Sequence, residues 1–365
     1  MAMRLHRWVA LVAGAWFLLL GLTGAAMVWH GEIDRALNPA WFAPLASCDA
    51  PATPIAAALA VYATEVPNGT PTQVMSPIEP GAAYVVWDKP GELRRQHFVD
   101  VACGRYLGAR DWGAVRFDAA HFVPAMYELH RSLLSGETGH IVVGFGGLGL
   151  LFVAISGLIT AWPRHHTRTN WKRVFTMKRE AGMHRKLYDL HRATGAWLFA
   201  FLALMSLTGA YLCFPKQGRA IVSSVLPTSP AELSKTDANV ANASPDSLAR
   251  RAQSLWPDTQ WTRVLLPNDK TPAFDIRLLQ AAEIRADTGD TRVRLRGDGT
   301  VVDQRDPLRG PAGDRVIAWF FPLHSGEALG LAGRIAWSIF GLAPALLFLT
   351  GGWLWWKRRS VQKRR

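Results

Sequence analysis

The sequence predicts an all-α four-helix bundle in a membrane, with two α+β inserts outside the membrane and an internal duplication. Three observations support this fold class. The chain has 365 residues, 49% of them apolar, and the apolar residues concentrate in four runs of the roughly 20 residues that span a bilayer. The same motifs recur at fixed spacing in both halves of the chain. Basic residues gather in short segments beside the apolar runs.

The duplication is visible in motifs that combine a histidine with a hydroxyl-bearing residue and a glycine. One motif recurs at an offset of 185 residues and another at an offset of 194, without gaps. The first pair of copies is His6 with Thr23-Gly24 and His191 with Thr208-Gly209, and the second pair is His130 with Ser156-Gly157 and His324 with Thr350-Gly351. The chain therefore repeats one unit of helix, insert and helix.

The charge distribution predicts the topology. The formal net charge is +13, from 41 Lys and Arg against 28 Asp and Glu. Basic residues precede the first apolar run, fill the segment between the second and third, and follow the fourth. The positive-inside rule then places both termini in the cytoplasm. Because the charge lies beside the membrane rather than on a soluble face, a nucleic-acid partner is not expected.

The four apolar runs are expected to be membrane helices at about 8–29, 140–162, 190–214 and 332–356. The first run has the basic start of a signal peptide, but it is long and its pattern returns in mid-chain, so we expect a retained anchor. The second run is rich in glycine. Small residues either let helices approach closely or leave room for something flat between them.

Each insert is expected to hold one helix and a small antiparallel sheet on the outer side of the membrane. In the first insert, strand-like pieces near 72–76, 82–88 and 95–102 follow an amphipathic helix at 54–65. In the second, a helix runs from Ser244 to Trp256 and strands follow at 260–266, 272–279, 291–296 and 300–304. Arg296-Gly297-Asp298-Gly299-Thr300 predicts a hairpin turn.

These elements divide the chain into consecutive segments. The predicted membrane helices occupy 1–30, 136–163, 190–215 and 326–357. The outer inserts occupy 31–135 and 216–325, the second beginning with a loose linker, while 164–189 is a basic cytoplasmic loop and 358–365 a cytoplasmic tail.

The cysteines leave two readings open. Cys48 and Cys103 both fall in the first insert, where an oxidising compartment would permit a disulfide, and two separate thiols fit equally well. Cys213 lies in the third apolar run and is expected to be packed. No Cys-x-x-Cys-His occurs, which excludes covalent attachment of a c-type haem.

Of the 11 histidines, most lie near a predicted membrane boundary. Ionisable groups at membrane depth point to function, although a histidine at a boundary can also be an ordinary interfacial residue. The duplication favours function, because His6 and His191 hold one repeat position and His130 and His324 hold another. A pseudo-two-fold axis would place the members of each pair face to face.

Two facing neutral imidazoles provide the axial ligands for a b-type haem, a cofactor that four-helix bundles house in their cores. We therefore expect two haems b, with iron ligated by His6 and His191 at the inner edge and by His130 and His324 at the outer edge. A site for a metal alone would want carboxylates or cysteines as well. The four apolar runs contain no acidic residue, which argues against a di-iron carboxylate site or a proton-relay transporter.

The outer pair presents a difficulty. His130 precedes the apolar part of the second run by about 10 residues, some 15 Å along a helix. His30 and His140 lie nearer the outer boundary and are the reserve candidates for the outer haem ligands.

The motifs with which the histidines occur resemble those of the PepSY-associated transmembrane family, over nearly the whole chain. The resemblance rests on four stretches: Leu5-His6-Arg7-Trp8, Leu129-His130-Arg131 with Ser156-Gly157-Leu158, Leu190-His191-Arg192-Ala193-Thr194-Gly195, and Leu323-His324-Ser325-Gly326-Glu327 with Trp355-Trp356-Lys357-Arg358. Both inserts look like PepSY modules. The chain departs from a symmetric pattern at Arg334, which stands where His140 stands in the first repeat.

By that resemblance the chain is expected to be a ferric-siderophore reductase of the bacterial inner membrane with two periplasmic modules. Electrons would pass from a cytoplasmic or quinol donor through two b haems to a ferric siderophore in the periplasm, releasing Fe(II). Direct use of NADPH or flavin is not expected, because the sequence has no nucleotide-binding motif. The alternatives are a non-catalytic PepSY binding or regulatory protein, which needs no haem, and a siderophore permease. The lack of intramembrane acids and of paired broken helices argues against the permease.

Overall fold

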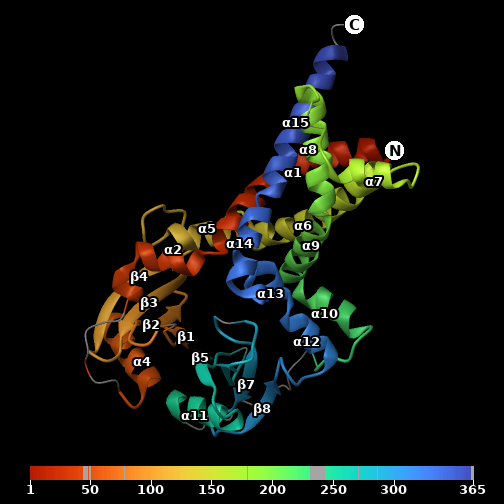
Figure 1. The fold of residues 1–365 in the computed structure, drawn as a ribbon. Helices are drawn as coiled ribbons and strands as arrows, with labels where there is room; N and C mark the ends of the chain where they lie inside the picture. The colour runs from red at the N-terminus through yellow and green to blue at the C-terminus, as the bar shows by residue number, and fades with distance from the viewer. Residues whose placement is uncertain are drawn as a thin grey trace. The chain divides into compact units, whose positions relative to one another are not determined.

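A computed structural model of the chain contains two compact units (Figure 1). The helical unit comprises Met1–Trp29, Tyr127–Gly218 and Leu323–Arg365, and the sheet unit comprises His30–Met126 and Arg219–Pro322. The structure describes residues 1–43, 48, 51–77, 79–178, 180–230, 243–269, 271–285 and 287–362. Most of the predicted linker in 227–247 and the end of the predicted tail therefore lie outside the described residues.

The main helices of the helical unit are apolar over most of their length, except the one at Met183–Trp197, which carries many polar and charged residues. They are α1 (Ala2–Met27), α6 (Gly136–Ala161), α8 (Met183–Trp197), α9 (Phe199–Cys213), α14 (Gly330–Phe340) and α15 (Ala343–Gln362). Shorter helices connect or flank them: α5 (Phe122–Ser132), α7 (Arg168–Phe175), α10 (Pro215–Ser223), α13 (Phe320–Ser325) and the 3₁₀ turn η1 (Glu327–Leu329). Helix α6 packs along α9, and α1 packs along α15.

Among the described residues, three helical stretches are long and apolar enough to cross a membrane, at Ala2–Met27, Gly136–Ala161 and Glu327–Ser360. The predicted third helix, 190–214, is not one straight helix. Helices α8 and α9 meet at a bend of 58° and together could form a further span. Leu198, between them, has φ −95° and ψ 8°, outside the helical region, and this interrupts the hydrogen-bond ladder. The predicted basic loop 164–189 contains α7 and the start of α8.

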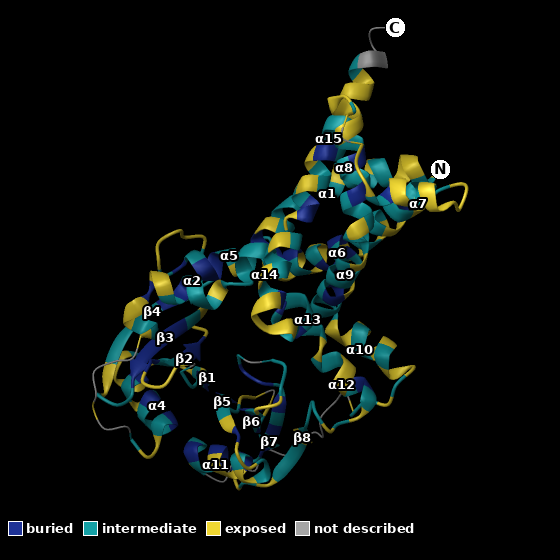
Figure 2. Cartoon of the chain, viewed as in Figure 1, coloured by how far each residue is buried: buried dark blue, intermediate teal, exposed yellow. Residues whose placement is uncertain are grey.

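Glycines allow the long helices to pack closely. A Cβ at Gly14 of α1 would lie 2.1 Å from the ring of Phe348 on α15, and one at Gly144 of α6 would lie 2.4 Å from Phe214. The outward faces are apolar instead, with Val12 83% and Phe145 62% exposed, and Figure 2 shows exposed residues distributed along the long helices. This combination of small residues at helix contacts and large apolar residues outside is typical of helices in lipid.

The sheet unit is built on one antiparallel sheet of eight strands. The strands are β1 (Pro71–Met75), β2 (Tyr84–Asp88), β3 (Arg94–Asp100), β4 (Arg105–Trp112), β5 (Gln260–Leu265), β6 (Phe274–Leu279), β7 (Thr291–Leu295) and β8 (Val301–Arg305). Their order is β4-β3-β2-β1-β5-β6-β7-β8. The two inserts were expected to form separate sheets, but β1 pairs with β5 and joins the halves. Each insert would otherwise leave an unpaired strand edge there.

The core of the sheet unit lies between one face of the sheet and two helices. Helix α4 (Pro54–Glu65) comes from the first insert and α11 (Pro245–Leu255) from the second, and both bury apolar residues against strands. The Asp246 carboxylate accepts hydrogen bonds of 2.9 Å from the backbone N–H groups of Ile55 and Ala56, so α11 caps the first turn of α4. Short helices complete the unit: α2 (His30–Leu37), α3 (Pro39–Phe42) and α12 (Ala312–Ala318).

Cys48 and Cys103 form a disulfide, with Cα atoms 5.3 Å apart. Of the two readings that the sequence left open, the structure has the disulfide. Cys213 is a free thiol on α9, as expected for a packed residue of the third apolar run.

Candidate functional site

Two pairs of histidines meet in the helical unit. His6 on α1 and His191 on α8 have ring centroids 6.4 Å apart, with an angle of 84° between the rings. His130 on α5 and His324 on α13 have ring centroids 6.3 Å apart, with an angle of 50°. The structure thus brings together the two residues that hold the same repeat position in each case. The four histidines come from four different helices, so the pairs depend on the packing of the whole unit.

Each histidine is held by the hydroxyl residue of a motif from another helix. His130 Nδ1 lies 3.0 Å from Thr23 Oγ1, and His324 Nδ1 lies 2.9 Å from Thr208 Oγ1. His191 Nδ1 lies 3.0 Å from Thr350 Oγ1. His6 Nδ1 lies 3.1 Å from Ser156 Oγ and 3.0 Å from the Val153 carbonyl oxygen. Within each repeat the motifs therefore exchange partners, the histidine of one motif contacting the hydroxyl of the other.

The hydroxyl groups determine which ring nitrogen carries the proton. Thr23 Oγ1 donates its single hydrogen to the Leu19 carbonyl oxygen at 2.8 Å, and Thr350 Oγ1 donates to the Leu346 carbonyl oxygen at 2.7 Å. A hydroxyl whose proton is already engaged can only accept from the imidazole. The hydrogen therefore sits on Nδ1 of the histidine, and Nε2 keeps its lone pair. The Thr208 and Ser156 hydroxyls are engaged in the same way.

The glycine of each motif gives the imidazole its place. A Cβ at Gly24 would lie 2.9 Å from His130 Cε1, and one at Gly157 would lie 3.1 Å from His6 Cε1. A Cβ at Gly209 would lie 3.1 Å from His324 Cε1, and one at Gly351 would lie 3.2 Å from His191 Cε1. In each case the Cε1 edge of the ring lies so close to the helix backbone that any side chain larger than that of glycine would push the ring away.

The spacing of the paired rings suits one metal ion between them. An imidazole nitrogen bonds a metal at about 2.0 Å and lies about 1.1 Å from its ring centre, so two imidazoles on one metal have centroids about 6.3 Å apart. The observed 6.4 and 6.3 Å match this separation. Ordered Nδ1–H donors and bare Nε2 atoms are what the second shell of a histidine–metal site requires. The residues present therefore fit bis-histidine ligation of a haem iron.

His130 reaches its place through a sharp corner between α5 and α6. Leu133 and Leu134 have φ values of 52° and 56°, and Gly136 has φ 57°. A Cβ at Gly139 would lie 1.7 Å from the Ser132 carbonyl oxygen, so only glycine permits the close return of the chain. The predicted distance of His130 from the membrane helix assumed a continuous helix. That assumption is wrong, because the corner folds α5 back.

The second repeat builds the same corner between α13 and α14. Gly326 and Gly330 have φ values of 83° and 59°. A Cβ at Gly333 would lie 2.4 Å from the Gly326 carbonyl oxygen. Gly330 and Gly333 follow Gly136 and Gly139 at the offset of 194 that relates His130 to His324. The corner glycines shape the turns that carry two of the candidate site histidines; sequence reasoning missed them, although the repeat offset carried their signal.

The reserve histidines have other surroundings. His140 Nδ1 lies 3.2 Å from the Arg131 carbonyl oxygen, and His30 is exposed on α2 of the sheet unit. Arg334, the repeat counterpart of His140, donates to the Val28 carbonyl oxygen at 2.7 Å and stacks on Trp29.

A cavity opens beside the His6–His191 pair. Glycine and apolar residues line most of it, together with the basic side chains of Arg7, Arg192 and Arg358. Arg7 Nε is buried without a hydrogen-bond partner among the described residues. An apolar cavity with cations at its rim suits a flat apolar group that carries carboxylates, which is the chemical character of haem.

The fold and the histidine geometry define a membrane protein with a duplicated helical unit and a joined pair of α+β inserts. The family described as the PepSY-associated TM region matches residues 3–358, and the chain belongs to this family. An uncharacterised protein of Pseudomonas aeruginosa is 26% identical over 261 residues, which is 64% of this chain and 63% of that protein. The chain thus spans less than two thirds of the length of this curated relative.

Proposed function

We propose that the chain is a di-haem b cytochrome of the bacterial inner membrane that passes electrons from the cytoplasmic side to a ferric siderophore in the periplasm. The single observation that carries this proposal is the geometry of the two histidine pairs. Each pair has the ring separation of a bis-histidine metal site, and each of the four rings has its Nδ1 hydrogen engaged.

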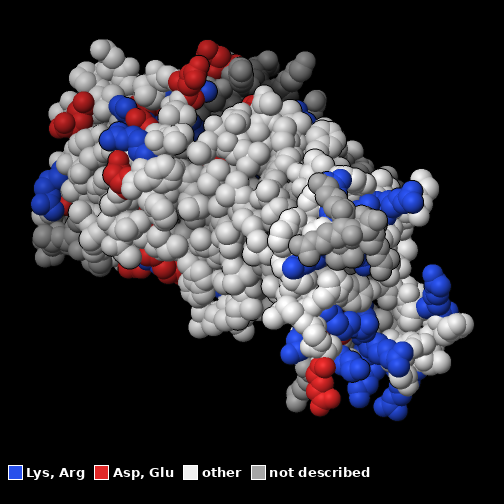
Figure 3. All heavy atoms as spheres, turned by 90° about the horizontal axis from the view of Figure 1, so that it is seen from above, with Lys and Arg blue, Asp and Glu red and all other residues white. Residues whose placement is uncertain are grey.

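The proposed topology has four membrane spans, with α8 and α9 together forming one of them. Both termini and the basic segment around α7 would face the cytoplasm. Figure 3 shows many Lys and Arg and few Asp and Glu at the end of the helical unit that carries the chain termini. This asymmetry supports the proposed orientation. The Cys48–Cys103 disulfide supports a periplasmic position for the sheet unit, because disulfides persist in oxidising compartments.

The residues of the helical unit have distinct roles in this proposal. His6 and His191 would hold one haem, and His130 and His324 the other, each through Nε2. When bound, haem supplies reversible one-electron transfer at iron. The serine and threonine hydroxyls would fix the ring orientation and keep the proton on Nδ1, and Arg7 would offer a cation to a haem propionate.

The ferric siderophore is the proposed substrate. One electron reduces its Fe(III) to Fe(II), and the siderophore, which binds Fe(II) weakly, then releases the metal. The reaction consumes one electron per iron, which a cytoplasmic or quinol donor would supply at the side of His6 and His191. The lipid bilayer separates donor from acceptor, so the two haem sites would form the route for the electron through the chain.

The visible spectrum of the detergent-purified protein, oxidised and then reduced with dithionite, tests the haem assignment. We expect sharp reduced α and Soret bands and about two b haems per chain in a pyridine haemochrome assay. A folded protein without colour would overturn the proposal and favour the non-catalytic binding protein.

Single substitutions test the ligand pairs. His6→Ala and His324→Ala should each remove about one haem, because each pair loses one of its two axial ligands. His140→Ala serves as the matched control and should leave both haems in place. Loss of haem from the His140 variant, or two haems retained in His6→Ala, would show that the pairs are assigned wrongly.

Reductase activity needs a separate test. In proteoliposomes with a reductant inside, a ferric siderophore outside should yield Fe(II), trapped by a chromogenic chelator in the outer solution. The His6→Ala variant should show almost none. Siderophore uptake into the liposomes without reduction would favour the permease instead.

A further inference from the structure

Four arginines form a row across the second half of the sheet. Arg263 on β5 pairs with Arg277 on β6, Arg277 pairs with Arg292 on β7, and Arg292 pairs with Arg305 on β8. Cross-strand partners place their side chains on the same face, and like charges directly opposite each other are destabilising. The alternating residues of these strands are buried against α11 on the other face. The row therefore needs negative charge from elsewhere.

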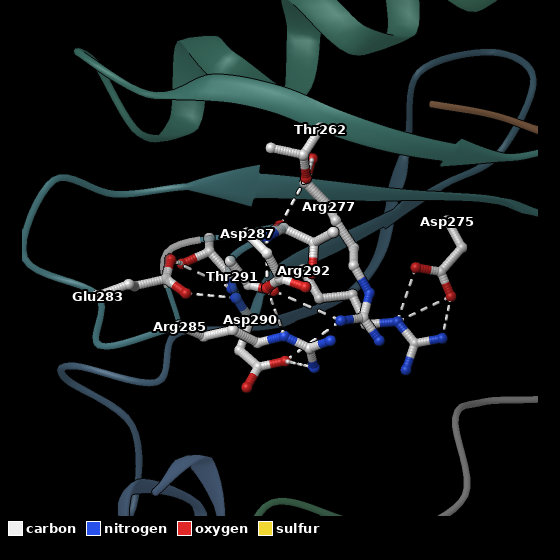
Figure 4. Close-up of polar contacts among 11 residues, drawn as sticks. Thr262, Asp275, Arg277, Glu283, Arg285, Asp287, Asp290, Thr291 and Arg292 are labelled. Atoms are coloured by element: carbon white, nitrogen blue, oxygen red, sulfur yellow. Dashed lines mark hydrogen bonds and ion pairs between the residues drawn. The ribbon is translucent and has the colours of Figure 1, made fainter. Parts of the chain in front are cut away.

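Carboxylates balance three arginines of the row. The ion pairs are Asp275 with Arg292, Asp290 with Arg277 at 3.2 Å, and Asp303 with Arg305 at 3.9 Å. Figure 4 shows Asp275 beside Arg292, and Asp290 on the side of the strands to which Arg277 and Arg285 extend.

Arg263 is the exception. Its guanidinium forms no hydrogen bond or ion pair with any described residue, and its Nε atom is buried. The positive charges of Arg277, Arg285 and Arg94 repel the guanidinium of Arg263, and the carboxylate of Asp287 attracts it. That carboxylate is itself bound by Arg285 at 2.9 Å. Burial lowers the pKa of Arg263 to about 10, and repulsion from Arg277 and Arg285 acts in the same direction.

The connection between β6 and β7 folds over this face and shapes the site. Thr262 Oγ1 donates to the Thr288 carbonyl oxygen at 2.5 Å, which ties the connection to β5 (Figure 4). Arg285 on the same connection turns its guanidinium back toward the sheet, 3.5 Å from Asp290. The side chains of Arg277 and Arg285 stay 22% and 19% exposed, so a small solute has access to the positive charge.

We propose that Arg263, together with Arg277 and Arg285, binds an oxyanion: the carboxylate or phosphate group of a small solute or of a lipid headgroup. A guanidinium offers donors in a planar fork that matches two oxygens of such a group. The anion would supply the one counter-charge that the row lacks. This site lies in the sheet unit and goes beyond the proposed electron transfer, on which it does not depend.

Calorimetric titration of the full-length protein in neutral detergent tests the site, with citrate and then inorganic phosphate as probes. Wild type should bind at least one of them, and Arg263→Gln should weaken that binding by at least about tenfold, because a charged hydrogen bond is lost. Arg250→Gln, which removes an exposed arginine of α11, is the matched control and should bind as wild type. The absence of binding by wild type, or equal binding by Arg263→Gln, overturns the proposal.

Thermal unfolding separates a binding role from a structural one. Without ligand, Arg263→Gln should melt at the same or a higher temperature than wild type, because it removes an unpaired charge. Citrate should raise the melting temperature of wild type but not of the variant. A variant that melts lower without ligand would assign Arg263 to structure and overturn the proposal. The haem spectrum of the variant should be unchanged, so failure here is distinct from failure of the proposed cytochrome.

Two lipid compositions distinguish the sources of the anion. The protein is placed in nanodiscs of neutral lipid and in nanodiscs of phosphatidylglycerol, and citrate binding is measured in both. Loss of citrate binding only in phosphatidylglycerol supports the site with a lipid headgroup as its ligand. Equal binding in both supports the site with a soluble solute as its ligand.

Discussion

The helical unit and the sheet unit carry the same internal duplication, but the repeats have remained alike in one and have diverged in the other. In the helical unit each histidine meets a hydroxyl and a glycine in the same geometry. In the sheet unit one cross-strand row crosses all the strands. Its first half consists of Gly108, Phe98, Val85 and Met75, and its second half consists of Arg263, Arg277, Arg292 and Arg305.

The coverings of the two half-rows explain this divergence. On the first half, Trp41 of α3 stacks on Phe98 with ring centroids 4.1 Å apart, and the indole also covers Gly108. On the second half, the β6–β7 connection brings carboxylates and Arg285 against the arginines. A segment that covers the sheet with apolar side chains requires apolar residues beneath it, whereas a segment that carries charged side chains permits charged residues beneath it.

This difference between the two units indicates which residues of a duplicated chain must stay alike in both repeats. A site made jointly by both repeats, such as a histidine pair, requires equal contributions from each. The open face of each half-sheet has its own cover, so the two halves can serve different purposes. We therefore expect matched substitutions to act equally in the helical unit and unequally in the sheet unit.

The largest effect is expected at the corner glycines. Gly139→Ala and Gly333→Ala each place a Cβ against a backbone oxygen, which no rotamer change relieves. Each variant should displace one histidine of the His130–His324 pair, and both should lose about one haem to the same extent. The haemochrome assay measures this. Gly182→Ala is the control, because a Cβ there meets nothing within 4 Å and Gly182 does not line the cavity beside His6 and His191.

A double variant identifies which haem is lost. If the corners serve only the His130–His324 pair, Gly139→Ala combined with His6→Ala should be colourless. A double variant that still holds one haem, or unequal losses from the two corner variants, would contradict the symmetry of the repeats.

The next largest effect is an unequal response of the two halves of the sheet to substitutions in the same cross-strand row. Phe98 is fully buried, and Phe98→Ala should destabilise the sheet unit by about 3–5 kcal/mol through the cavity it leaves. Arg263→Ala, in the same row, should leave the free energy of unfolding unchanged, because Arg263 forms no hydrogen bond or ion pair with any described residue. Urea unfolding followed by tryptophan fluorescence gives both values. Similar losses from the two variants would mean that both half-rows are structural and would remove the contrast between them.

Removal of the supporting hydroxyls should give smaller and equal effects. Thr23→Val and Thr208→Val each leave a buried Nδ1–H without its acceptor, a cost of about 1–3 kcal/mol. Outer-shell partners of a histidine ligand contribute about 10–100-fold to metal affinity, so both variants should release haem faster to an acceptor protein. Ser206→Ala is the control, because the buried Ser206 Oγ donates to the Leu202 carbonyl oxygen and has no histidine partner among the described residues. Release that is no faster than in this control would remove the hydroxyls from the site.

Sequence patterns predicted much of the fold. Apolar runs and turn residues placed most of the helices and strands close to their observed bounds, although the strand β4 was not predicted, and the repeat offsets identified which histidines are equivalent. The bend at Leu198 had no such signal, since neither Pro nor Gly occurs there. Likewise, Leu133 and Leu134 adopt positive φ although leucine does not favour it. Tertiary packing imposes both features, and the conformational propensities of the local sequence do not predict them.

The pairings that depend on distant segments were the least predictable. His6 contacts the hydroxyl of Ser156, and His130 contacts the hydroxyl of Thr23, so each histidine is held by the other motif of its repeat. These contacts follow from how α1 packs against its neighbours. The arginine row is hidden in the same way, because its members lie on separate strands and only the register of the sheet aligns them. A repeat comparison could have found the corner glycines, but no local pattern marks the row.

The smallest expected effect is a pH dependence confined to the second half of the sheet. Burial would raise the pKa of Asp275, but its hydrogen bonds to Arg292, one of them 2.6 Å, and the charge of Arg294 outweigh burial and lower this pKa below its usual value. An aspartate with a lowered folded-state pKa contributes stability above its unfolded value of about 3.9, and this contribution is lost as the pH falls through the folded-state value.

The melting temperature of the sheet unit should therefore fall as the pH drops below about 4, and Asp275→Asn should flatten this fall while lowering the melting temperature at pH 7. The exposed Asp269→Asn variant, which removes the same charge elsewhere in this half, should keep the wild-type profile. A profile for Asp275→Asn that matches wild type would mean that Asp275 does not balance the arginine row. The charge of Arg292, like that of Arg263, would then need an external anion to neutralise it. The open face of the second half of the sheet would bind more than one anion, whereas aromatic rings cover the same face in the first half.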